Sequence, residues 1–219
     1  MASESERNGG AAESLNDIGL RYGTDKADRK HDYLRHYETE LGGLRDEPFD
    51  LLEIGVRFGD SIRMWHDYFP KATIVGVDIK TVALGSGLDR FIFHRGDQAD
   101  AAFLDSLIDT YRFQVMVDDG SHFWDHQIFS FQHLFPALLP GGVYICEDLL
   151  TSYPKRAEKF RNGAEQSGMQ YFLKLAEYVT GGGSGGLDGP AGPEWDRILA
   201  KVDSIRFIRH AAIIRARVD

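Results

Sequence analysis

The 219-residue chain has few of the features that mark a specialised class of protein. Its one cysteine, Cys146, excludes an internal disulfide, and its place in an apolar run favours a packed side chain over a nucleophile. No run approaches the roughly 20 apolar residues of a membrane span. The polar residues 1–6 lack the basic and apolar parts of a signal peptide. The sequence therefore predicts a cytoplasmic protein with no membrane partner.

A basic excess is also missing. The 25 Lys and Arg residues against 34 Asp and Glu residues give a net charge of −9, which argues against nucleic acid as the main partner. The length fits one domain. Small polar residues at 1–14 predict a disordered tail before a domain at 15–219. Seven glycines and two prolines at 181–193 predict a mobile segment.

Short apolar runs alternate with helical patterns along the chain. The runs expected to form strands are 49–55, 72–78, 91–98, 113–118 and 143–147, and then 204–208 and 211–215. The helical patterns are 33–41, 64–69, 101–111, a segment between 118 and 143, and a segment within 160–179. Residues 18–26 are expected to form a Gly-punctuated polar loop. The alternation predicts an α/β fold with a doubly wound, mostly parallel, seven-stranded sheet that ends in an antiparallel hairpin.

Paired acids follow two of the expected strands. Asp118 and Asp119 end the fourth strand, and Glu147 and Asp148 end the fifth. Carboxyl ends of parallel strands share one edge, where open α/β sheets bind ligands. Magnesium prefers six oxygen ligands, so Asp119, Glu147 and Asp148 leave room for two vicinal hydroxyls and a water. Taken singly, each acid pair has a simpler explanation as a turn or a helix cap.

His122 follows Asp119 by three residues, on the turn that leaves the fourth strand. An imidazole that titrates near neutrality suits a general base, and His122 is the predicted catalytic residue. Adjacent residues on a strand point to opposite sides, so Asp118 faces a cofactor or holds the turn. His126 and His133 lie on the following helix, where packing or solvent exposure is the expected role.

A glycine turn follows the first strand. Glu53, Gly55 and Gly59 form an E-x-G-x-x-x-G pattern, which differs from the G-x-G-x-x-G of dinucleotide folds. Asp78 ends the second strand 19 residues beyond Gly59. The pattern resembles the S-adenosylmethionine loop of class I methyltransferases, which have a Rossmann-like fold. The C-terminal hairpin is a usual feature of that family.

The resemblance implies roles for the cofactor-binding residues. It would place Asp78 on the ribose hydroxyls, Asp97 or Gln98 at the adenine, and Glu53 near the amino group of the methionine part. Gly55 and Gly59 would be points of close backbone approach to the methionine. Thr24 and Lys26 would close over the methionine carboxylate or the active site. These cofactor assignments come from the family pattern.

The subfamily is indicated by residues 22–26 (YGTDK), 118–122 (DDGSH) and 147–148 (ED). Together they resemble the metal-dependent sugar O-methyltransferases that tailor macrolides and related bacterial natural products in antibiotic biosynthesis. The resemblance covers residues 18–155 and resumes at the hairpin. It implies a Mg²⁺- and S-adenosylmethionine-dependent enzyme that methylates a sugar hydroxyl of a small-molecule glycoside. A sugar hydroxyl is almost wholly protonated at neutral pH, so a coordinating cation helps by lowering its pKa.

Other functions remain as alternatives. A catechol-type O-methyltransferase also binds vicinal oxygens, but that class usually has an amide ligand and a lysine base. The glycine spacing disfavours an NAD-dependent oxidoreductase. A non-catalytic cofactor-binding protein would need neither the metal nor His122. The sequence leaves a homo-oligomer open, since the early helix could contribute to a subunit contact.

Overall fold

The computed structural model describes residues 12–82, 84–182, 185–187 and 189–219. Within these residues the core is a seven-stranded sheet with the order β3-β2-β1-β4-β5-β7-β6. The strands are β1 (Asp50–Ile54), β2 (Thr73–Asp78), β3 (Phe91–Arg95), β4 (Phe113–Asp118), β5 (Val143–Cys146), β6 (Val202–Ile208) and β7 (Ala211–Ala216). Strands β1 to β5 pair in parallel, and β7 is antiparallel to both β5 and β6. The predicted doubly wound sheet with a C-terminal hairpin is confirmed.

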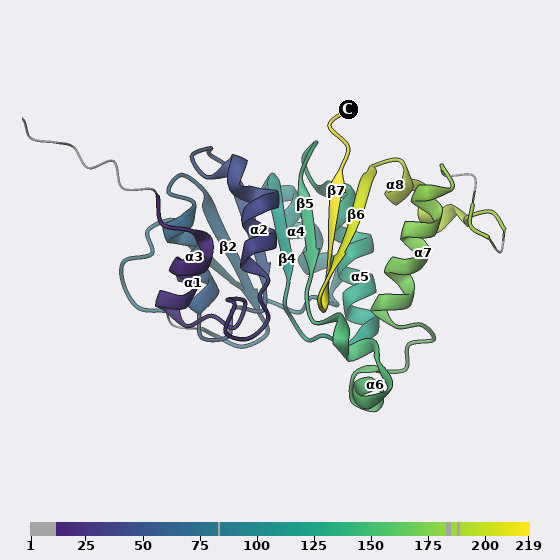
Figure 1. Cartoon of the computed structure of the whole chain (residues 1–219), viewed down its shortest axis with the longest axis horizontal. Helices are drawn as coiled ribbons and strands as arrows, with labels where there is room; N and C mark the ends of the chain where they lie inside the picture. The colour runs from purple at the N-terminus through teal and green to yellow at the C-terminus, as the bar shows by residue number, and fades with distance from the viewer. Residues whose placement is uncertain (1–11, 83, 183–184, 188) are drawn as a thin grey trace, which may run out of the picture.

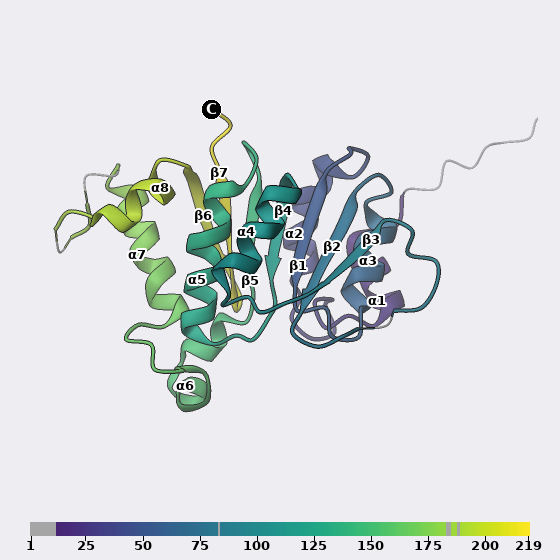
Figure 2. The same cartoon turned by 180° about the vertical axis from the view of Figure 1, so that it is seen from behind.

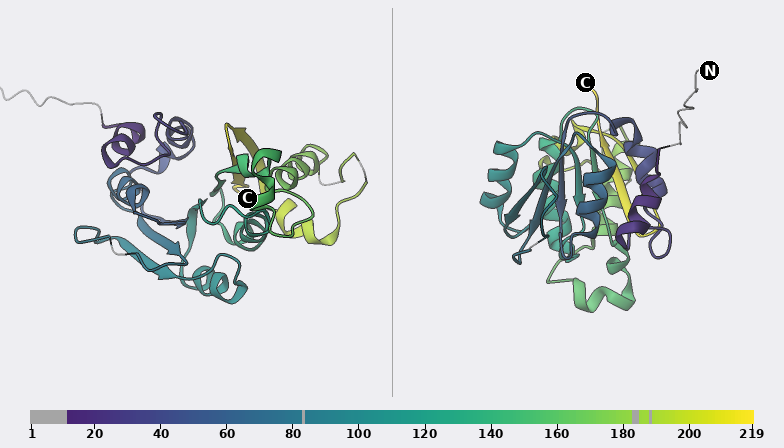
Figure 3. Two further views of the ribbon diagram at one scale, coloured as in Figure 1. Left: turned by 90° about the horizontal axis from the view of Figure 1, so that it is seen from below. Right: turned by 90° about the vertical axis from the view of Figure 1, so that its left-hand side faces the viewer.

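Helices cover both faces of the sheet (Figures 1 and 2). The α-helices are α1 (Leu15–Tyr22), α2 (Leu34–Leu41), α3 (Asp60–Tyr68), α4 (Ala101–Thr110), α5 (Trp124–Leu134), α6 (Pro154–Phe160), α7 (Gly168–Thr180) and α8 (Asp196–Leu199). The 3₁₀ helices are η1 (Gly42–Leu44), η2 (Phe135–Ala137), η3 (Leu149–Ser152) and η4 (Pro193–Trp195). Helices α1 to α3 lie on one face, and α4, α5 and α7 lie on the other, as the edge-on view shows (Figure 3).

Each face of the sheet has its own hydrophobic core. Trp65 on α3 and Tyr37 on α2 are fully buried against the sheet residues that point to the α1–α3 side. Phe131 on α5 and Phe172 on α7 are buried against residues that point to the opposite side. Strands β1, β4 and β5 are therefore covered on both faces, which explains their almost continuous apolar sequences.

The strand order places the carboxyl ends of β1, β4 and β5 next to one another at one edge of the sheet. Ile54 at the end of β1 pairs with Asp118 at the end of β4, and Asp118 pairs with Cys146 at the end of β5. The segments that follow these strands therefore leave the sheet side by side. Because β2 and β3 lie on one side of β1, and β4 and β5 lie on the other, the order in which strands are added to the sheet reverses between β1 and β4, as at the ligand-binding crevice of other open α/β sheets.

The N-terminal segment differs from the expected polar loop. Residues 18–22 belong to α1, which buries Leu15 and Ile18 and is capped by the Ser14 side chain. Gly23 ends the helix with φ of 76°, a left-handed conformation that glycine adopts without strain. The glycines in this stretch obscured a short helix because Gly19 lies inside it, packed close to the Leu34 side chain.

Two predicted mobile regions fall partly outside the described residues. Of the expected tail at 1–14, residues 1–11 lie outside them, and Ser14 is the cap of α1. Of the Gly-rich stretch at 181–193, residues 183, 184 and 188 lie outside them, and Pro193 begins η4. Its mobility stays a prediction. No helix among the described residues is long and apolar enough to cross a membrane.

Candidate active site

A cavity of about 1020 Å³ opens at the carboxyl ends of β1, β2 and β4. Its volume matches the upper range of small-molecule and cofactor sites. The predicted site residues that line it are Thr24, Gly55, Asp78, Asp97, Gln98, Asp119, His122 and Asp148. Sequence positions from 24 to 148 thus converge on one cavity, as expected for loops that share the carboxyl edge of a parallel sheet.

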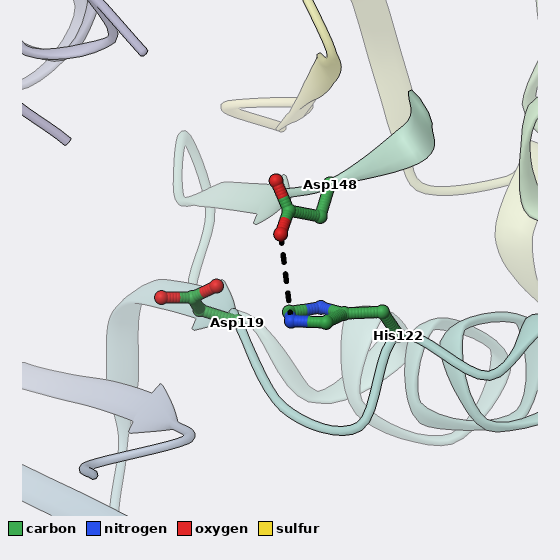
Figure 4. A group of neighbouring side chains, drawn as sticks. All are labelled: Asp119, His122 and Asp148. Atoms are coloured by element: carbon green, nitrogen blue, oxygen red, sulfur yellow. Dashed lines mark ion pairs between the residues drawn. The ribbon is translucent and has the colours of Figure 1, made fainter. Parts of the chain in front are cut away.

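Asp119, His122 and Asp148, which all line this cavity, form a compact group (Figure 4). One potential ligand atom from each residue lies within 4.8 Å of the others. His122 Nε2 is 3.4 Å from Asp148 Oδ2. Two carboxylates and an imidazole at this spacing could share a divalent cation, since both groups are common metal ligands.

The backbone at this group is strained. His122 has φ of 59° and Asp148 has φ of 56°, in the left-handed region that residues with a Cβ rarely adopt. The buried Thr151 side chain holds both turns, because its hydroxyl lies 2.9 Å from the Asp148 carbonyl oxygen and 3.4 Å from that of His122. Thr151 was not singled out from the sequence, where it is one more polar residue of a loop.

Glu147, the third predicted metal ligand, lies beside this group but faces Lys26. The Lys26 ammonium is 2.8 Å from Glu147 Oε1, 2.5 Å from Asp119 Oδ2 and 3.4 Å from Glu53 Oε1. Burial and the Asp119 charge raise the pKa of Glu147. Burial by itself would lower the pKa of Lys26, but the charges of Asp119, Glu147 and Glu53 raise it well above its ordinary value. The ammonium is therefore the counter-ion of these acids.

Glu53 and the two glycines of the loop serve the fold around the cavity. Glu53 is fully buried beneath the site and accepts a hydrogen bond from Trp65 Nε1 at 3.0 Å. Gly55 has φ of 96°, and a Cβ there would overlap the carbonyl oxygen of Asp119. Gly59, with φ of 75°, precedes α3, and a Cβ there would overlap the Leu84 side chain. Gly55 therefore lies close to the β4 turn, and it also lines the cavity.

Asp118 and Gln98 hold the turn after β4 from below. Gln98 Nε2 donates to Asp118 Oδ1 at 3.1 Å, and Gln98 Oε1 accepts from the Ser121 amide at 2.7 Å. Tyr144 donates to Asp118 Oδ2 at 3.3 Å. Burial raises the pKa of Asp118 to about 6. Asp118 is only 1% exposed, so of its two predicted roles the geometry supports holding the turn.

Asp78 and Asp97 keep carboxylates at the cavity surface. Asp78 accepts from the backbone amides of Arg57 and Lys80 at 3.0 and 2.9 Å, which fixes its orientation at the end of β2. Asp97 accepts from the Ala99 amide at 2.9 Å. Both Asp97 and Gln98 line the cavity, and the amide of Gln98 is engaged in hydrogen bonds to Asp118 and Ser121.

Of the two histidines on α5, one lies at the cavity and the other lies away from it. Ser121 Oγ is 2.9 Å from His126 Nδ1 on α5, and His126 lines the cavity. His133 on the same helix is 2.8 Å from Asp105 and lies away from the cavity. The Tyr33 hydroxyl is 3.4 Å from Asp148 Oδ1, so the segment before α2 also reaches the site. The sequence signal for this contact was weak, since Tyr33 resembles an ordinary core aromatic.

Comparison with known proteins finds close sequence relatives, although no protein-family model matches the chain. It is 38% identical over 147 residues to a mycinamicin VI 2''-O-methyltransferase from Micromonospora griseorubida, a match that covers 64% of this chain and 37% of the relative. It is 36% identical over 151 residues to a demethylmacrocin O-methyltransferase from Streptomyces fradiae. This match covers 65% of this chain and 38% of the relative. The chain thus spans less than two fifths of the length of these relatives.

A solved structure of the MycE methyltransferase, in complex with Mg, SAH and mycinamycin VI, superposes with a TM-score of 0.81. The match has 29% sequence identity and covers 94% of this chain and 54% of that one. Another MycE structure, with Mg and SAH, gives a TM-score of 0.78 over 94% of this chain and 56% of that one. The chain therefore has the class I methyltransferase fold and is a relative of the sugar O-methyltransferases of macrolide biosynthesis.

Proposed function

We propose that this protein transfers a methyl group from S-adenosylmethionine to a sugar hydroxyl of a glycosylated natural product, and that the reaction requires Mg²⁺. The observation that carries the proposal is the convergence of Asp119, His122 and Asp148 at the rim of the large cavity. The similarity to a mycinamicin VI 2''-O-methyltransferase and to a demethylmacrocin O-methyltransferase supports the substrate class.

The donor set fits a hard divalent cation. Asp119 and Asp148 each keep a carboxylate at the cavity, and Glu147 is one residue away from Asp148. We propose these three as the metal ligands, with His122 beside them. A bound Mg²⁺ would supply Lewis acidity that lowers the pKa of the sugar hydroxyl. The ion pairs of the buried Lys26 ammonium with Asp119 and Glu147 support a cation at this position.

His122 would take the proton of the sugar hydroxyl. Its Nε2 faces Asp148 and the cavity, whereas its Nδ1 is buried and has no hydrogen-bond partner among the described residues. The proton would therefore go to Nε2. Asp148 at 3.4 Å would stabilise the imidazolium that forms. The Thr151 contacts keep both residues in these positions.

The cofactor would lie across the rest of the large cavity. Asp78 and Asp97 line this cavity and would contact the ribose and the adenine, and Thr24, which follows α1, also lines it. We propose that the backbone at Gly55 and Gly59 approaches the methionine part and that Glu53 lies near its amino group; of these residues, Gly55 lines the cavity.

A second cavity of about 530 Å³ suits the rest of the acceptor. It is lined by apolar residues of η3, α7 and the β6–β7 hairpin, by Lys155 and Arg156 of α6, and by His210. His210 contacts His31, a wall residue of the large cavity, with a distance of 6.2 Å between ring centroids. We propose that the sugar lies at Asp148 and that the aglycone extends toward this second cavity.

Calorimetric titration tests the cofactor class. S-adenosylhomocysteine should bind and NAD should not, whereas NAD binding alone would contradict the proposal. A deoxysugar glycoside and a simple catechol, compared as acceptors, separate the leading function from the catechol-type alternative.

We propose residues 15–219 as the methyltransferase domain. Light scattering of the purified chain tests whether it forms a homo-oligomer.

A further inference from the structure

Lys26 is the most deeply buried cation beside the candidate site. Its side chain is 1% exposed, and lysine is almost never buried to this extent unless it is paired. The ammonium touches Asp119 and Glu147, which come from the ends of β4 and β5, and Glu53 near the end of β1. One side chain from the N-terminal loop thus joins the ends of three neighbouring strands.

The charges around Lys26 are unbalanced. The Lys26 ammonium contacts three carboxylates, those of Glu53, Asp119 and Glu147. A fourth carboxylate, that of Asp148, lies beside Asp119 and pairs with the His122 ring. When all are ionised, this cluster has a net charge of −3. Like charges this close repel strongly in a buried site, so the acids need a cation to keep their present positions.

The loop that carries Lys26 is firmly built. The Lys26 carbonyl accepts from the Tyr33 amide at 2.9 Å, and the Ala27 carbonyl accepts from the amides of Lys30 and Asp32 at 3.1 Å. Ala27 itself is buried. Removal of the ammonium would therefore leave the surrounding backbone in place, because these bonds do not involve the Lys26 side chain.

We propose that Lys26 is the resident cation of the carboxylate cluster, a positioning residue that holds Asp119 and Glu147 in place and competes with the divalent ion for their negative charge. This inference rests on the proposed function, since it assumes that the cluster binds a metal. It assigns to Lys26 neither a proton transfer nor a contact with the acceptor.

Replacement of Lys26 by methionine tests both effects of the ammonium, its support of the acidic side chains and its competition with the divalent ion. Lys26→Met keeps the length of the side chain and removes its charge, so the metal-free protein should lose stability. A divalent ion should then replace the missing charge. Mn²⁺ should bind about tenfold more tightly than it binds to the wild type, and the rise in Tm on metal addition should exceed the wild-type rise by about 4 °C.

The measurement is Tm in EDTA and in saturating Mn²⁺, together with calorimetric titration of Mn²⁺. Lys30→Met is the matched control, because Lys30 lies in the same loop, pairs with Asp25 and is 58% exposed. Its metal-dependent rise in Tm should equal that of the wild type. A rise in Lys26→Met that is no larger than the wild-type rise would overturn the proposal.

A second variant covers the case in which Lys26→Met fails to fold. Lys26→Met combined with Glu53→Gln keeps the net charge of the cluster at its wild-type value, and the new amide oxygen can still accept from Trp65. It should show the same enlarged metal effect. If both variants stay unfolded in saturating Mn²⁺, the ion does not replace the ammonium and the proposal fails. If the wild type itself shows no metal effect, the metal of the proposed function is at fault instead.

Discussion

The His122 ring and the Asp148 carboxylate face each other at the cavity rim, with Nε2 3.4 Å from Oδ2, and both residues have a left-handed backbone. Such a conformation in two residues with a Cβ stores strain that the surrounding structure must offset. Thr151 provides part of this support through its hydroxyl. The strained pair joins the segment after β4 to the segment after β5.

Replacement of His122 by alanine should remove the general base. We expect kcat for methyl transfer to fall by about 10²- to 10⁴-fold, the usual contribution of a positioned base. The affinity for S-adenosylhomocysteine should change little. His133→Ala is the control, because His133 lies on the adjacent helix, pairs with Asp105 and lies away from the cavity. A variant of His122 with wild-type kcat would remove it from the mechanism.

Replacement of Asp148 by asparagine should weaken metal binding. The neutral amide keeps the shape of the side chain but loses a charge of the ligand set, so we expect the Kd for Mn²⁺ to rise by about tenfold or more. Calorimetry measures this directly. Asp105→Asn is the matched control, because Asp105 is exposed and also pairs with a histidine, His133. It should leave the Kd for Mn²⁺ unchanged. An unchanged Kd in Asp148→Asn would exclude this carboxylate as a ligand.

The fold was largely predictable because its signals are local. Apolar runs marked all the strands, and the runs at β1, β4 and β5 ended in the acids that now lie along one edge. The misread segment was α1, where Gly19 and Gly23 favoured a loop. A single turn-forming residue carries little information on whether it lies inside a short helix or at its end.

The arrangement inside the site was less predictable. The sequence places Asp119 and Glu147 near each other, but it does not reveal which carboxylate oxygen faces a cation or which cation that is. The contact between Lys26 and Glu147 spans 121 positions in the chain and depends on how the N-terminal loop folds over the sheet edge. For Asp118 the sequence likewise left two roles open, a contact with the cofactor or support of the turn. Its burial and its hydrogen bond with Gln98 support the second role.

Asp118 should make stability depend on pH. Its pKa is raised from 3.8 to about 6 in the folded protein, so the protonated form favours folding. That contribution is fully present below pH 3.8 and is lost as the pH rises through about 6. Relative to Asp118→Asn, the wild type should therefore lose about 2 kcal/mol of unfolding free energy between pH 4 and pH 7. Urea unfolding of both proteins over this range measures the difference, and parallel pH profiles would contradict it.

Replacement of Gly55 by alanine should disturb the site from beneath. The added Cβ would overlap the Asp119 carbonyl oxygen, and φ of 96° is unfavourable for alanine. We expect a loss of about 2 kcal/mol or more in the free energy of unfolding, together with weaker metal binding as the β4 turn moves. Gly43→Ala is the control, because a Cβ there meets nothing within 4 Å. Equal effects of the two substitutions would argue against the close contact.

The dependence of methyl transfer on a divalent ion tests the account most directly. Labelled S-adenosylmethionine and a neutral deoxysugar glycoside of a macrolide would be incubated with the protein in Mg²⁺, in EDTA, and in EDTA followed by excess Mg²⁺. We predict transfer of label to the sugar in Mg²⁺, loss of transfer in EDTA, and recovery when Mg²⁺ is restored. Transfer at the same rate in EDTA, or no transfer to a glycoside under any of these conditions, would contradict the account.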